Sequence, residues 1–215
     1  MSLENNQIFT KVFMWMFVGL LITFGTGFYI SMNSNMFYNV FAKYYLFLAI
    51  IEIGVAIFLS VRIRKIKPMT AKILYLVYTF LTGLTFSAIF VVYEITSIIY
   101  VFGITALIFG IFAAIGYFTK MDLSKIGVYL MMILIGIIIC SIINVFVKSE
   151  AFNFGLVIAA LIIFIIYVAY DIQVIKKNLY AIPDEENLAI YGAFQLYLDF
   201  INIFIRLLEL IGNRK

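Results

Sequence analysis

The chain has 215 residues with a net charge of +4; 66% are hydrophobic, 12% are charged, and the mean hydropathy is +1.14. These values lie outside the range of soluble globular domains and predict an integral membrane protein. Apolar segments fill nearly the whole length and exclude a separate soluble catalytic domain, so we expect a single transmembrane domain over residues 1–215.

The sequence predicts seven transmembrane helices, because a helix needs roughly 20 apolar residues to cross the hydrocarbon core. The apolar runs fall near 12–32, 44–61, 73–93, 98–118, 126–147, 154–175 and 188–211. The first residues, "MSLENNQIFTK", lack the basic segment and the cleavage site of a signal peptide, so we expect the first run to be retained. The predicted fold class is an all-α membrane protein, a bundle of seven transmembrane helices.

Basic residues at the ends of these runs predict the orientation. Ten lie at one set of ends, namely Lys11, Arg62, Arg64, Lys65, Lys67, Lys72, Lys120, Lys125, Lys176 and Lys177, and four at the other, namely Lys43, Lys148, Arg214 and Lys215. This bias predicts a cytoplasmic N-terminus and, after seven crossings, a C-terminus outside. The same distribution accounts for the net charge, so we expect no nucleic-acid partner.

Small residues recur at every fourth position in the third and fourth predicted spans. They are Gly83 with Ser87, and Ala106 with Gly110 and Ala114. Such spacing lets helix backbones approach closely. We expect these positions to pack within the chain rather than to form a dimerisation face.

The seventh predicted span carries polar side chains at regular intervals. Gln195, Asp199, Asn202, Arg206 and Glu209 follow alternating spacings of four and three residues, which places all five on one helical face. A charge at the bilayer centre costs about 2.5–3.5 kcal/mol. We therefore expect the other helices or water, and not lipid, to surround this polar face.

Two carboxylates lie within membrane depth on consecutive spans, Asp171 and Asp199. Counted from the cytoplasmic ends of their helices, they lie about 7 and 16 Å deep, a difference that tilt and side-chain length can close. Neighbouring carboxylates in a low dielectric cannot both ionise readily, so the pair should titrate as a unit. The chain has no histidine, and this pair is our predicted pH sensor.

Further charges lie on the second predicted span. Glu52 is in its middle, and Arg62 and Arg64 are at its cytoplasmic end, at about the depth of Asp171, where a guanidinium can pair with a carboxylate through two hydrogen bonds. A structural interpretation stays open for all these residues. Polar side chains in membranes also serve as hydrogen bonds between helices, and Arg206 with Glu209 can be a simple ion pair.

Three stretches resemble one family of membrane proteins. "YTFLTGLT" at 78–85, "AYDIQVIK" at 169–176 and "LYLDFINIFIRLL" at 196–208 are similar to the Bax inhibitor family of transmembrane proteins, in its short bacterial form. The resemblance covers essentially the whole chain and implies a seven-helix bundle with the seventh helix central. It also implies a pH-sensitive calcium leak across the membrane.

The resemblance assigns roles to individual residues. Asp171 and Asp199 match the family's di-aspartyl pH sensor, and an arginine on the second helix latches the closed state by pairing with the first aspartate. Counted from Glu52, the expected position falls on Ile63, so Arg62 and Arg64 both remain candidates and we favour Arg62. Calcium, which prefers oxygen ligands, would pass Glu52, Asp171 and Asp199 transiently.

Other functions fit parts of the same pattern. A proton-coupled cation exchanger also needs a protonatable pair. An intramembrane aspartyl protease is a remote alternative, because the chain has "LYLD" where that class has Gly-x-Gly-Asp. An interaction role also stays open, although the chain offers little soluble surface. We expect a protein of the bacterial inner membrane that is not an enzyme, has no cofactor, and has the bilayer, calcium and protons as partners.

Overall fold

The chain folds almost entirely into helices. The computed structural model describes residues 2–33, 37–38, 42–63, 65–178 and 184–215, with side chains described from residue 7 onward. The helices are α1 (Ser2–Met32), α3 (Ala42–Arg62), α4 (Pro68–Val92), α5 (Ile95–Phe118), the short 3₁₀ helix η2 (Leu123–Lys125), α6 (Gly127–Val147), α7 (Glu150–Asn178) and α8 (Glu185–Ile211). Within these described ranges, seven helical segments are long and apolar enough to cross a membrane. The predicted fold class is confirmed, with boundaries close to those expected.

Local signals explain where several helices begin and end. Pro68 opens α4, where its missing N–H costs no helical hydrogen bond. Lys148 ends α6 in the left-handed conformation, at φ 54°. Asp184 caps α8, because its Oδ1 accepts hydrogen bonds from the backbone N–H groups of Glu186 at 2.8 Å and Asn187 at 3.1 Å.

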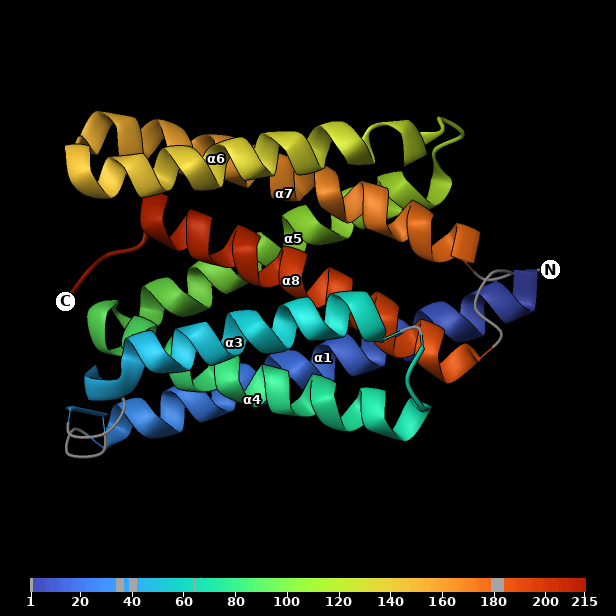
Figure 1. The fold of residues 1–215 in the computed structure, drawn as a ribbon, viewed down its shortest axis with the longest axis horizontal. Helices are drawn as coiled ribbons and strands as arrows, with labels where there is room; N and C mark the ends of the chain where they lie inside the picture. Colours follow the sequence, from blue (N-terminus) through green and yellow to red (C-terminus); the bar gives the residue numbers. More distant parts are fainter. Residues whose placement is uncertain (1, 34–36, 39–41, 64, 179–183) are drawn as a thin grey trace. The chain divides into compact units, whose positions relative to one another are not determined.

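The chain divides into two compact units, and α8 contributes to both. The first comprises Met1–Ile95, Asn178–Tyr197 and Arg214–Lys215, and so contains α1, α3, α4 and the first part of α8. The second comprises Thr96–Lys177 and Leu198–Asn213, with α5, η2, α6, α7 and the rest of α8. Figure 1 traces these elements along the chain.

In the first unit, α1 and α4 lie side by side (Figure 1). A Cβ atom at Gly83 would lie 2.7 Å from the Cβ of Thr26 and 3.0 Å from the carbonyl oxygen of Thr23, so only glycine fits this contact. Thr23 Oγ1 donates to the carbonyl oxygen of Thr79 at 2.9 Å and lies 2.6 Å from the hydroxyl of Tyr197 on α8. The expected close packing of the third predicted span is confirmed at Gly83.

In the second unit, α5 and α7 approach closely at a glycine outside the predicted stripe. A Cβ atom at Gly116 would lie 2.4 Å from the carbonyl oxygen of Ala169. Ala106, Gly110 and Ala114 are exposed instead, and a Cβ atom at Gly110 would meet no atom within 4 Å. The prediction that this stripe packs within the chain is wrong for the described residues. Small residues at every fourth position make a helical face smooth, but they do not determine whether protein or lipid lies against it.

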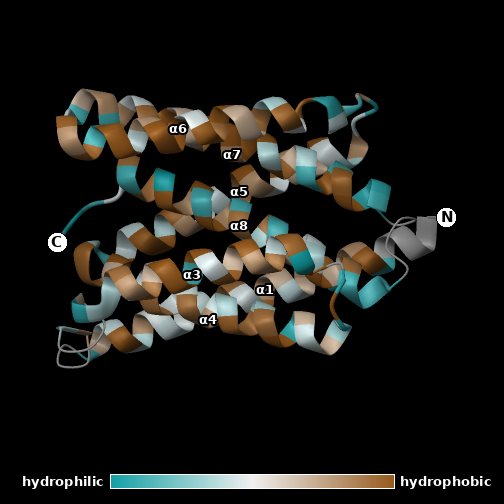
Figure 2. Ribbon diagram, viewed as in Figure 1, coloured by the Kyte–Doolittle hydropathy of each residue, from teal (hydrophilic) through white to brown (hydrophobic). Residues whose placement is uncertain are grey.

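Burial distinguishes α8 from the other spans. Within the most apolar window of each span, 78% of the α8 residues are buried, whereas only 6% are buried in α3 and in the Leu123–Val147 span that contains α6. Figure 2 shows α6 as largely hydrophobic, while hydrophilic bands recur along α8. The prediction that protein surrounds the polar seventh span is confirmed.

Candidate functional site

The candidate site is a pair of aspartic acid side chains in the second unit, one on α7 and one on α8. Asp171 and Asp199 are only 5% and 4% exposed. The two side chains lie within hydrogen-bonding reach of each other. The fold thus brings together the two carboxyls that the sequence placed at different depths.

A hydrogen bond between two carboxyl groups needs a proton on one of them, because an ionised carboxylate can only accept. When both groups are ionised, two negative charges face each other in a buried place, so the contact between them depends on their protonation. Oδ2 of Asp199 has no hydrogen-bond partner among the described residues.

Tyr167 adds a hydroxyl group to this environment. It lies one helical turn before Asp171 on α7, so both side chains share one face of that helix. Its hydroxyl is within electrostatic range of both Asp171 and Asp199. Sequence reasoning missed this residue, although its spacing of four from Asp171 was available as a signal.

Glu52 lies in the first unit and has a different kind of neighbour. The hydroxyl of Thr82 donates to its Oε1 at 2.8 Å, and the hydroxyl of Thr85 donates to its Oε2 at 3.0 Å. Both threonines are on α4, three residues apart and therefore on one face. They belong to the "YTFLTGLT" stretch, where the threonine spacing was the signal that sequence reasoning did not use.

The rest of the polar stripe on α8 makes mostly local contacts where contacts are described. Asn202 Nδ2 donates to the carbonyl oxygen of Leu198 at 2.8 Å, one turn back. Arg206 and Glu209 form an ion pair at 2.8 Å, with both side chains about one-third exposed. Gln195 is half-buried. For Asn202, Arg206 and Glu209 these contacts agree with the structural interpretation left open by the sequence.

The two latch candidates differ in what the structure describes. Arg62 is the last residue of α3 and is exposed, while the next residue, Ile63, is fully buried. Arg64 lies outside the described residues. The choice between the two arginines therefore stays a prediction.

No group of three or more Asp, Glu, His or Cys side chains that could hold a metal ion occurs among the described residues. Glu52 has two hydroxyl donors on its oxygens, and the aspartic acid pair has its own hydrogen bond. Calcium is treated below as a passing ion, which requires oxygen ligands but no resident site.

These features define a multi-pass α-helical membrane protein with a buried pair of hydrogen-bonded carboxyls on two of its helices. The chain belongs to the family described as "Inhibitor of apoptosis-promoting Bax1", which matches residues 5–215. The family resemblance inferred from the three sequence stretches is confirmed.

Bacterial relatives cover nearly the whole chain. An uncharacterized protein of Borreliella burgdorferi is 39% identical over 99% of this chain and 94% of its own length. Inner membrane protein YbhL of Escherichia coli strain K12 is also 39% identical, over 95% of this chain and 91% of its own. An uncharacterized protein of Deinococcus radiodurans is 33% identical over 100% and 94%. The similarity therefore extends over all seven spans.

Proposed function

We propose that this protein is a pH-sensitive calcium leak channel whose gate responds to the protonation of Asp171 and Asp199. The observation that carries the proposal is the buried hydrogen bond between these two side chains on neighbouring stretches of α7 and α8. Such a pair converts a change in proton concentration into a change in local charge and in helix contact. Family membership supports the same conclusion.

The gating step is a change in the charge of the pair. At neutral or alkaline pH the ionised pair attracts an arginine at the end of α3, with Arg62 as our preferred latch and Arg64 as the alternative. Acidification protonates the pair, weakens this attraction and frees α3 to move. Acid therefore favours the open state.

The permeating ion needs oxygen atoms along its route. Glu52 supplies a carboxylate within the membrane, and the α8 stripe adds the amide oxygens of Gln195 and Asn202 with the Arg206–Glu209 pair at its far end. Hard cations such as calcium prefer these ligands, and weak successive contacts let an ion leave again. Calcium is thus the substrate of the protein, and no resident cofactor is proposed.

The proposed location is a bacterial inner membrane, with the chain crossing it seven times. The Escherichia coli relative is named an inner membrane protein, and the basic residues at the span ends favour a cytoplasmic N-terminus. In this orientation the latch arginines and the start of α8 lie toward the cytoplasm. The pair would then respond to cytoplasmic pH.

The test is calcium flux into proteoliposomes between pH 5 and pH 8. We expect acid-activated flux for the wild type and a flat pH profile for Asp171→Asn and for Asp199→Asn, because an amide cannot take up a proton in this range. Asp122→Asn is the matched control, since Asp122 is an exposed carboxylate, and it should keep the wild-type profile. Equal pH dependence in all four proteins would refute the role of the pair.

A proton-coupled cation exchanger is the second candidate, because the same protonatable pair suits coupled transport. The two functions differ in their driving force. A leak passes calcium down its own gradient when the pH is equal on both sides, whereas an exchanger needs a counter-flow of protons. Flux that stops when the proton gradient is collapsed with an ionophore would favour the exchanger.

A further inference from the structure

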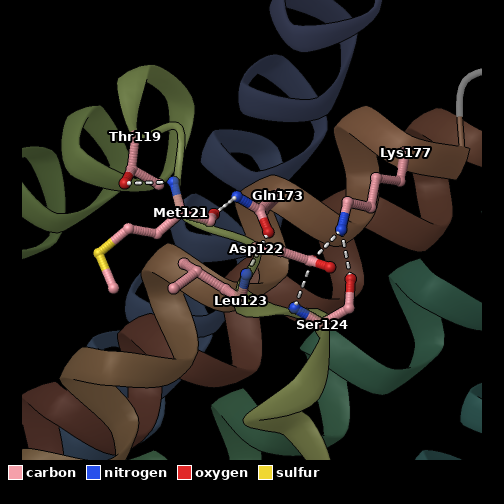
Figure 3. A network of polar contacts seen from close by, with 7 residues as sticks. All are labelled: Thr119, Met121, Asp122, Leu123, Ser124, Gln173 and Lys177. Atoms are coloured by element: carbon pink, nitrogen blue, oxygen red, sulfur yellow. Dashed lines mark hydrogen bonds and ion pairs between the residues drawn. The ribbon is translucent and has the colours of Figure 1, made fainter.

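The α5–α6 loop, residues 119–126, is attached to α7 by the side chain of Gln173 (Figure 3). The Gln173 amide nitrogen donates to the carbonyl oxygen of Met121 at 2.7 Å, and its Oε1 accepts from the backbone N–H of Leu123 at 2.7 Å. The side chain is only 8% exposed. One buried amide therefore satisfies a donor and an acceptor of the loop backbone, on either side of Asp122.

Gln173 lies two residues beyond Asp171 on the same helix. At about 100° per residue, the two side chains point in directions about 200° apart, so they lie on opposite sides of α7. Ala169, which meets Gly116 of α5, is four residues before Gln173 and on its side of the helix. Thus one side of α7 faces α5 and its loop, while the other carries Asp171 toward Asp199.

The outer contacts of the loop are more exposed. Lys177 pairs with Asp122 and contacts the hydroxyl of Ser124, with side chains of Lys177 and Asp122 about half exposed. Exposed ion pairs contribute little to stability, because water screens the charges and the two long side chains lose freedom. A buried amide with two short hydrogen bonds holds the helix more firmly, because breaking it leaves unsatisfied backbone groups.

We propose that Gln173 is a positioning residue for the pH sensor: by fixing the rotation of α7 against the α5–α6 loop, it sets the contact between Asp171 and Asp199. The inference rests on the proposed function for its physiological meaning. Among the described residues, Asp199 faces Asp171 from α8 and Tyr167 shares its face of α7, whereas Tyr170 packs against Gly127 of α6. If α7 turns, the two aspartic acids separate and no longer share a proton.

The positioning role of Gln173 also gives the α5–α6 loop a part in pH sensing. The loop between two membrane helices becomes part of the sensor, with Lys120, Asp122 and Lys125 as its own titratable residues and Lys177 of α7 paired with Asp122. Any event that displaces this loop from α7 changes the pH at which the pair takes up its proton. The stretch "AYDIQVIK" therefore contains both the sensing carboxyl of Asp171 and Gln173, the residue that positions it.

The test follows the protonated carboxyl band by infrared spectroscopy and, in parallel, calcium flux, each across pH 5 to 8 in the full-length protein in liposomes. The band is assigned by its loss in Asp199→Asn. Gln173→Met keeps the size of the side chain and removes both hydrogen bonds. We expect its midpoint in both measurements to move to lower pH by about one unit, a tenfold change in the protonation equilibrium, because separated carboxyls repel each other less.

Leu123→Pro changes the contact from the loop side. It removes the backbone N–H that donates to the Oε1 of Gln173. Proline is tolerated there because Leu123 is the first residue of η2. The extended conformation of Asp122, at φ −80° and ψ 98°, also suits a residue that precedes proline. We expect a shift in the same direction but smaller. Lys177→Met, which removes only the exposed pair, is the control and should shift the midpoint by less than about 0.3 unit.

The outcomes separate the two proposals. If Gln173→Met is folded and its carboxyl titration coincides with that of the wild type, the positioning role is overturned; if it does not fold, an unchanged midpoint in Leu123→Pro overturns it. If the band shifts as expected but no protein passes calcium at any pH, the leak is wrong and the positioning role stands. If the wild-type band does not titrate, both proposals fail.

Discussion

The two membrane carboxyl sites differ in what surrounds them. Glu52 in the first unit accepts one threonine hydroxyl on each oxygen, and both hydroxyls come from one face of α4. Asp171 and Asp199 in the second unit face each other, an arrangement that suits a shared proton. The proposed function assigns these two sites different roles, contact with a passing cation for Glu52 and pH sensing for the aspartic acid pair.

The largest expected effect follows from removing the charge of Glu52. We expect Glu52→Gln to lower calcium flux roughly tenfold, equivalent to about 1.4 kcal/mol, at every pH with an unchanged midpoint, because an amide binds a passing cation more weakly. Flux across pH 5 to 8 is the measurement. Thr85→Val removes only one of the two hydroxyls that bind Glu52 and leaves the one of Thr82, so it should lower the calcium flux by less. A moved midpoint in Glu52→Gln would mean that Glu52 also senses pH.

A second change tests how firmly α7 is held beside the aspartic acid pair. Gly116→Ala puts a methyl group where a Cβ atom would lie 2.4 Å from the carbonyl oxygen of Ala169. We expect a loss of about 1–3 kcal/mol in the free energy of unfolding, because backbone atoms of two helices must move apart. Thermal unfolding in detergent measures it. Gly110→Ala is the matched control on the same helix, since its Cβ meets no atom within 4 Å, and equal stability of the two variants would contradict the close approach.

The smallest expected effect concerns the exposed loop pair. The pKa of Asp122 is lowered from 3.8 to about 2, mainly by the hydrogen bond from Lys177 and to a smaller extent by hydrogen bonds from the backbone N–H and the hydroxyl of Ser124. Because the folded-state pKa is below the unfolded value, this contribution to stability is present above about pH 4 and is lost as the pH falls through about 2. Unfolding measured between pH 2 and pH 5 should show a slight acid destabilisation that is absent in Lys177→Met. Between pH 5 and pH 8 the two proteins should differ by a constant amount, which leaves the sensing range to other groups.

Periodicity made most of the fold predictable. Seven apolar runs with charged ends gave the spans to within a few residues, because membrane length and backbone hydrogen bonding leave a hydrophobic segment few alternatives. The polar stripe on the seventh span also predicted its burial, since lipid cannot solvate Asp199. The small-residue stripe at Gly110 failed, because a smooth face can meet lipid as well as another helix.

Residue order alone predicts the membrane class, the seven spans, the family and the two aspartic acids as candidates. The packing of the helices establishes that Asp171 and Asp199 make contact, that Thr82 and Thr85 hydrogen-bond to Glu52, and that Gln173 binds the α5–α6 loop. The difference follows from the range of the interactions. Hydropathy and helical spacing are local properties of the chain, whereas a hydrogen bond between side chains depends on how each helix is rotated, and packing against other helices sets that rotation.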